Sequence, residues 1–237
     1  MHRLPFRLVP SLLLVATLAA CAIDSPTSPR FSVAPPAHTP ILFVHGWNAS
    51  GTTWTTMIAR FKADGWTDAE LANWSYDFKQ SNATTASIIA KKVDSILAVT
   101  GAPQVAIVSH SMGALSARYY LRNGASFGKV DAMVTLGGAN HGTNTAAFCF
   151  DTSCREMVPG SSFLTALNAD DETPGAFRYA TWWSPCDEVI NPLSSALLAG
   201  ATNTQTACLK HSALHEDATV YAQVKTWVNQ PVTALIM

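Results

Sequence analysis

A candidate nucleophile lies in the segment AIVSHSMGALSARYYL, residues 106–121, where an apolar run typical of a buried strand gives way to small residues typical of a helix. A sharp strand-to-helix turn holds its central side chain clear of the sheet, at a helix N-terminus whose N–H groups favour negative charge. Such a turn tolerates only small residues two positions to either side, and here these are Ser109 and Gly113. The pattern predicts Ser111 as the nucleophile and Ser109 as a spacer.

The residues around Ser111 resemble those of a known family. SHSMG at residues 109–113, followed by VTLGGANHGT at residues 134–143, is similar to the small secreted bacterial lipases of the α/β-hydrolase superfamily. Those lipases usually carry Ala where this chain has Ser109, and the change keeps a small residue. The similarity runs from about Pro40 to the C-terminus and is patchy between residues 143 and 177. It implies cleavage of carboxylic esters, lipids included, through an acyl-enzyme, and it implies no cofactor or metal.

A serine hydroxyl needs a base that removes its proton and an acid that orients the base. In this superfamily the chain order is serine, acid, histidine. His211 and His215 both follow Ser111 at a suitable distance. The family has two histidines four residues apart ahead of its last helix, and this pattern matches its catalytic histidine to His215. His211 is the alternative.

Asp187 is the candidate acid. It follows an expected strand at residues 178–183, at the edge where parallel sheets collect their ligands. The rejected candidates are those in a polar loop and one too near His215 along the chain: Asp151, Asp170, Asp171 and Asp217.

The superfamily rule also implies an oxyanion hole made of two backbone N–H groups. One comes from the residue after the nucleophile and one from the loop after the first core strand. These residues are Met112 and Trp47, and Gly46 permits the close approach of the backbone.

Other functions would use the same residues. A polyester depolymerase or an acyltransferase needs an identical triad, so both stay open beside a lipase or carboxylesterase. A non-catalytic binding protein with a hydrolase fold is disfavoured, because it would not need serine, acid, histidine and both oxyanion positions in order.

The elements that must position these residues alternate between strands and helices. This alternation predicts an α/β fold of the compact α/β-hydrolase form, with a doubly wound, mostly parallel sheet and helices on both faces. Apolar runs predict strands at residues 40–46, 70–78, 104–110, 131–138 and 178–183. Apolar periodicity predicts helices that include residues 54–61, 86–97, 112–122 and 221–228.

The composition favours one globular domain and, we expect, a monomer. The chain has 237 residues, 48% apolar and 13% charged, which suits one sizeable core. The formal net charge of −1 provides no basic surface for a phosphate backbone, so we expect no nucleic-acid partner.

Residues 1–21 resemble an export signal, with a basic start and an apolar run too short to span a bilayer. Leu-Ala-Ala-Cys, ending at Cys21, resembles a bacterial lipobox, in which a lipidated cysteine anchors the protein to the cell envelope. The same residues fit ordinary signal cleavage and secretion, and both alternatives stay open. Residues 22–38 are then a tether rich in Pro and Ser, and residues 39–237 the catalytic domain.

Four cysteines remain once Cys21 is lipidated or lost, which suits an oxidising compartment. Of the three pairings, the local one closes the shortest first loop, so we expect disulfides between Cys149 and Cys154 and between Cys186 and Cys208. A zinc site is disfavoured by the lack of Cys-x-x-Cys spacing.

Residues 143–177 contain more chain than a short crossover needs. One hypothesis is a fixed wall beside the acyl pocket, stiffened by a disulfide between Cys149 and Cys154. The other is an ordinary crossover helix, with Phe163, Leu164 and Leu167 packed on the sheet.

Overall fold

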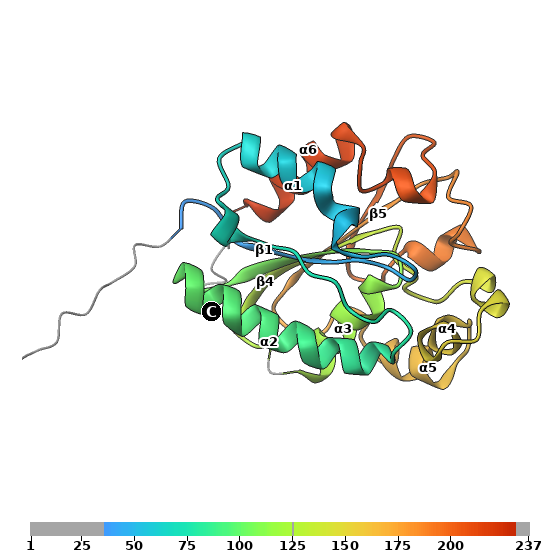
Figure 1. Cartoon of the computed structure of the whole chain (residues 1–237). Helices are drawn as coiled ribbons and strands as arrows, with labels where there is room; N and C mark the ends of the chain where they lie inside the picture. The colour runs from blue at the N-terminus through green and yellow to red at the C-terminus, as the bar shows by residue number, and fades with distance from the viewer. Residues whose placement is uncertain (1–35, 125, 231–237) are drawn as a thin grey trace, which may run out of the picture. The chain divides into compact units, whose positions relative to one another are not determined.

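The computed structural model describes residues 36–124 and 126–230, which form one sheet with helices on both faces (Figure 1). The sheet has six strands in the order β2-β1-β3-β4-β5-β6, and every neighbouring pair is parallel. The predicted α/β fold is therefore confirmed. The expected signal at residues 1–21 and most of the tether at residues 22–38 lie outside the described residues.

Strands and helices alternate along the chain. The strands are β1 (Ile41–Val44), β2 (Leu71–Ala72), β3 (Val105–His110), β4 (Val130–Leu136), β5 (Arg178–Trp183) and β6 (Thr202–Gln205). The α-helices are α1 (Thr55–Ala63), α2 (Asn82–Thr100), α3 (Gly113–Asn123), α4 (Thr152–Met157), α5 (Ser162–Leu167) and α6 (Ala218–Val228). Single turns of 3-10 helix are η1 (Gly51–Trp54), η2 (Asp68–Glu70), η3 (Asn144–Phe148), η4 (Leu193–Ala196) and η5 (His211–Ala213). Within the described ranges, no helix is both long and apolar enough to cross a membrane.

The central strands are buried on both faces, because α1 and α6 cover one side of the sheet and α2 and α3 the other (Figure 1). Successive side chains of a strand point to opposite faces. Along β3, Val108 belongs to the cluster that includes Phe61 of α1 and Val224 of α6. Its neighbour Ile107 belongs to the opposite cluster, which includes Ile89 of α2. The apolar run before Ser111 is thus the two-sided strand that its sequence predicts.

The strand expected at residues 70–78 is shorter than predicted, because β2 ends at Ala72. Beyond this point the polar side chains bind the loop after β1. The Asn73 side chain donates to the Gly51 carbonyl at 2.9 Å, and the Gly51 N–H donates to Ser75 Oγ at 3.0 Å. These bonds replace a longer ladder with β1.

Strand β6 has no apolar pattern from which it could be predicted. Its sequence is TNTQ, and as an edge strand it pairs only with β5. It nevertheless matters for the site, because the chain continues from it to His211.

Residues 143–177 contain η3, α4 and α5 rather than one crossover helix. Leu164 and Leu167 are buried in a cluster with Leu115 of α3, so this part packs against a helix of the core instead of the sheet. The disulfides Cys149–Cys154 and Cys186–Cys208 are both present, which confirms the predicted pairing.

Candidate active site

Ser111 occupies the tight turn between β3 and α3. Its φ of 56° lies in the left-handed region, which residues with a side chain rarely adopt. The turn also needs its small neighbours. A Cβ added at Gly113 would lie 2.4 Å from the His45 carbonyl oxygen, and one added at Gly46 would lie 2.8 Å from Ser111 Cβ. The strained turn leaves the serine between the end of β1 and the start of α3.

Asp187 lies four residues beyond β5 and forms a buried pair with His211. The His211 Nδ1–H donates to Asp187 Oδ2 at 2.8 Å. The other carboxylate oxygen, Oδ1, accepts from the backbone N–H groups of Val189 and Ile190, each at 2.9 Å. The carboxylate is therefore held from two sides and fixes the tautomer of the imidazole that it contacts.

In the structure the histidine that binds Asp187 is His211, whereas the pattern of the two histidines in the sequence favoured His215. The His215 ring packs edge-on against His110, with centroids 4.8 Å apart, and also lies near Trp54. Its Nδ1 is buried, with no hydrogen-bond partner among the described residues. The expectation for His215 as the partner of Asp187 is therefore wrong, and His211, the alternative, is the histidine bound to the acid.

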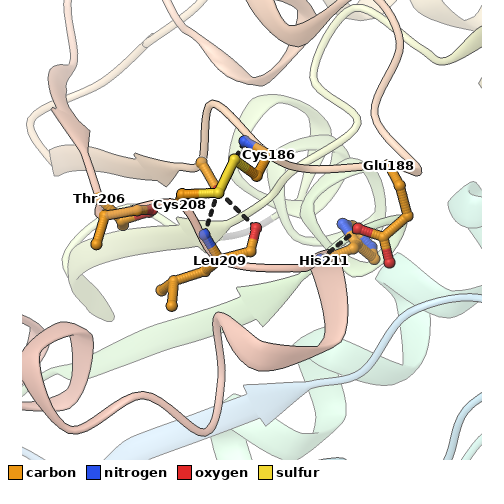
Figure 2. The surroundings of a disulfide bond; sticks show 8 residues. Cys186, Glu188, Thr206, Cys208, Leu209 and His211 are labelled. Atoms are coloured by element: carbon orange, nitrogen blue, oxygen red, sulfur yellow. Dashed lines mark hydrogen bonds between the residues drawn. A yellow bond between two sulfur atoms is a disulfide. The ribbon is translucent and has the colours of Figure 1, made fainter.

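Contacts between segments distant in sequence decide which histidine meets the acid (Figure 2). The Cys186–Cys208 disulfide joins the residue before Asp187 to the residue three positions before His211. Glu188, directly after Asp187, accepts a hydrogen bond from the His211 backbone N–H at 3.0 Å. Residues 186–188 thus hold residues 208–211 at both ends. His215 lies four residues further on, and its ring is near Trp54, which belongs to the core cluster on the side of α1 and α6.

His110 supports His211 from the other side. Its Nε2–H donates to the His211 carbonyl oxygen at 3.1 Å, and the two rings lie 4.5 Å apart. Burial lowers the pKa of His110 well below its usual value, and repulsion from His211 and His215 lowers it further. Burial also lowers the pKa of His215. Both imidazoles beside His211 therefore favour their neutral form, and the carboxylate that contacts its ring is Asp187.

A cavity of about 380 Å³ opens beside Ser111 and His211. Phe148, at its rim, is 85% exposed, so the cavity is open to solvent there. η3 and the Cys149–Cys154 loop supply much of one side. The lining residues are Trp47, Asn48, Ser111, Thr143, Thr145, Ala146, Phe148, Cys149, Met157, Val189 and His211.

The two residues expected to supply the oxyanion N–H groups lie close to this cavity. Met112 is the N-cap residue of α3, directly after Ser111. Trp47 lines the cavity, and its indole N–H donates to Asp151 Oδ2 at 3.0 Å. Because Gly46 lies against Ser111, the main chain that leads into Trp47 passes beside the serine.

Comparison with known proteins gives the family. The family model for Lipase (class 2) matches residues 38–231. The chain belongs to the class 2 lipase family. This confirms the resemblance to bacterial lipases, and it supports an ester hydrolase.

Solved lipase structures share the fold of this chain. The mature form of lipase BlEst2 from Bacillus licheniformis superposes with a TM-score of 0.73 and 18% identity, over 83% of this chain and 95% of that one. Lipase B from Aspergillus fumigatus gives a TM-score of 0.71 and 18% identity, over 84% of this chain and 56% of that one. At this identity the matches support the α/β-hydrolase fold.

Two residues that contact His211 at this site, Glu188 and His110, were not predicted from the sequence. Glu188 sits in a polar loop without a motif, and His110 reads as a packed core histidine, which it also is. Their contacts with His211 span 23 and 101 residues of chain. In the described ranges no group of three or more His, Cys, Asp and Glu side chains is arranged to hold a metal ion.

Proposed function

We propose that this protein is a serine ester hydrolase, a lipase or carboxylesterase that uses Ser111, His211 and Asp187. The observation that carries the proposal is the buried pair of Asp187 and His211 at 2.8 Å, on the cavity that Ser111 also lines. Ser111 follows β3, Asp187 follows β5 and His211 follows β6, so all three gather at the carboxyl edge of the sheet. Family membership supports the reaction class.

In the first half of the reaction, Ser111 Oγ bonds to the carbonyl carbon of the ester while its proton passes to His211 Nε2. The tetrahedral intermediate then collapses and its bond to the alcohol oxygen breaks. The alcohol leaves with the proton from His211, and the acyl group stays on Ser111. Asp187 keeps the imidazole oriented and stabilises its charged form.

In the second half, His211 takes a proton from a water molecule, whose oxygen attacks the acyl carbon. Collapse returns that proton to Ser111 Oγ and releases the carboxylic acid. In both halves we assign the oxyanion to the backbone N–H groups of Met112 and Trp47. Donors of this kind contribute about 3 kcal/mol each to transition-state stabilisation.

We further propose that the protein is exported. The two disulfides support this, because such bonds persist in oxidising compartments. Attachment to the cell envelope through a lipid on Cys21 is part of the same proposal, beside ordinary cleavage and secretion.

The test is covalent labelling combined with substitution of Ser111. An organophosphonate should label Ser111, as mapped by peptide mass spectrometry. Ser111→Ala should lower kcat on a soluble nitrophenyl ester roughly 10⁴-fold or more, because the members of such a triad act as a unit. Labelling at a different serine, or hydrolysis that survives Ser111→Ala, would contradict the assignment.

Ser109→Ala is the matched control. Its buried hydroxyl donates to the Val134 carbonyl of β4 at 3.0 Å and does not line the cavity. Loss of that bond should cost about 1 kcal/mol of stability while hydrolysis and labelling persist.

A further inference from the structure

The main chain of His211 is held by two side chains outside the Asp187 pair. Its backbone N–H donates to Glu188 Oε2 at 3.0 Å, and its carbonyl oxygen accepts from His110 Nε2 at 3.1 Å. With Asp187 on Nδ1, three polar groups of His211 are fixed by partners from the loop after β5 and from the end of β3. This leaves ring Nε2 for the exchange of a proton with Ser111.

We infer that Glu188 is a positioning residue for the base: its carboxylate fixes the backbone of His211 and thereby the direction of the imidazole. The inference rests on the proposed function, in which His211 is the base. Glu188 does not itself line the cavity, and its carboxylate contacts the backbone of His211, so it acts through His211.

The need for such a contact follows from the local chain. His211 is the first residue of η5, and the first N–H groups of a helical turn have no partner within the turn. The Glu188 carboxylate supplies that partner from the neighbouring loop. A hydrogen bond to an ionised acceptor is about twice as strong as one between neutral groups.

The other contacts that join this segment to neighbouring loops end at Leu209. The disulfide fixes Cys208, and Ser184 Oγ contacts both the N–H of Leu209 at 2.9 Å and its carbonyl at 2.6 Å. Lys210 is exposed. The Asp187 bond holds the ring at one atom and allows the backbone behind it to rotate. Glu188 and His110 together remove that freedom.

Of these two residues, Glu188 allows the clean test. His110 is buried, so its replacement also disturbs packing, whereas the Glu188 side chain is exposed. Glu188→Ala removes the hydrogen bond and the charge. Glu188→Gln removes the charge and keeps an oxygen that can accept the His211 N–H. Glu216→Ala is the matched control, because it removes an exposed carboxylate close in sequence to His211.

The measurements are kcat and KM on a soluble short-chain nitrophenyl ester and hydrogen exchange at the His211 amide. Glu188→Ala should lower kcat about tenfold and leave KM within about twofold, because a base displaced by a fraction of an ångström impairs chemistry and not substrate binding. Its His211 amide should exchange faster. Glu188→Gln should keep at least about half of wild-type kcat, and Glu216→Ala should match wild type.

Two results would overturn the inference. In the first, Glu188→Ala would have the same kcat as Glu216→Ala. In the second, the kcat of Glu188→Gln would be as low as that of Glu188→Ala. Failure of the proposed function looks different, because the wild type would then hydrolyse no ester or Ser111→Ala would stay active. In that case amide exchange at His211 still decides whether Glu188 holds this backbone.

Discussion

His211 and His215 lie four residues apart and differ in what surrounds them. His211 binds Asp187 and lines the cavity, whereas the His215 ring packs among Trp54 and His110. One environment suits a group that takes up and releases a proton. The other suits a neutral side chain that fills space, in keeping with the lowered pKa that burial gives His215.

Alanine substitutions should separate these roles. His211→Ala should be about as inactive as Ser111→Ala, because removal of either member disables the triad. His215→Ala should lose about 2 kcal/mol of stability through the cavity it leaves, and should keep most of its activity below its melting temperature. Thermal melts and kcat on a soluble ester measure both quantities. An inactive but well-folded His215→Ala beside an active His211→Ala would exchange the two assignments.

Local sterics made Ser111 predictable, because the tight turn between β3 and α3 has no room for a larger side chain at Gly113. The sequence shows this requirement as small residues two positions before and two positions after the serine. Asp187 was predictable from its position after a strand. The choice between His211 and His215 depended instead on the disulfide and on the contacts of Glu188 and His110, which join distant parts of the chain. Spacing alone carries no information about such contacts.

At the scale of elements, the loops after β5 and β6 carry Asp187 and His211, the proposed acid and base. The central strands were predictable because they are continuous apolar runs buried on both faces. β6 was not, because an edge strand with polar side chains has no such pattern. The Cys186–Cys208 disulfide compensates for this weak edge by tying the two loops together.

Removal of that disulfide should impair catalysis as well as stability. Cys186 and Cys208 are 22 residues apart, against 5 for Cys149 and Cys154. By chain entropy, the longer loop should contribute about 3 kcal/mol and the shorter about 2 kcal/mol. Cys186→Ser with Cys208→Ser should also lower kcat, because the loops of Asp187 and His211 are then joined only by hydrogen bonds.

The control is the double variant Cys149→Ser with Cys154→Ser, whose bond lies beside the cavity and away from the Asp187 pair. It should affect KM more than kcat. Urea unfolding and steady-state kinetics report both effects. Equal losses of kcat in the two double variants would show that the Cys186–Cys208 bond has no special part in aligning the loops.

At the scale of the whole molecule, the carboxyl edge of the sheet holds three histidines whose burial favours their neutral form. Burial lowers the pKa of His45, His110 and His215, and only in His45 and His110 does a backbone hydrogen bond oppose this. Such groups bind protons more weakly in the folded chain than in the unfolded chain, where their pKa is about 6.5. Folding stability should therefore be full above pH 6.5 and fall as the pH drops below it.

Carboxylates contribute in a lower pH range. Burial raises the pKa of Glu172, but hydrogen bonds from His141 and the Ala199 N–H outweigh it, so the pKa ends below 4.5. Its stabilisation is present above that value and is lost as the pH falls further. The range from pH 6.5 to 5 therefore isolates the histidines.

In that range the unfolding free energy should decrease as the pH falls, and His110, whose pKa burial lowers well below its usual value, should contribute to the decrease. Urea unfolding at pH 8, 6.5, 5.5 and 5 measures the slope. His110→Gln cannot titrate but keeps an N–H that can reach the His211 carbonyl, so the dependence of its unfolding free energy on pH should be weaker than that of the wild type, whatever its stability at pH 8. A wild-type stability that stays level from pH 6.5 to 5 would mean that the folded chain accepts these protons. The histidines behind His211 would then be charged at acidic pH and would oppose a proton on the base.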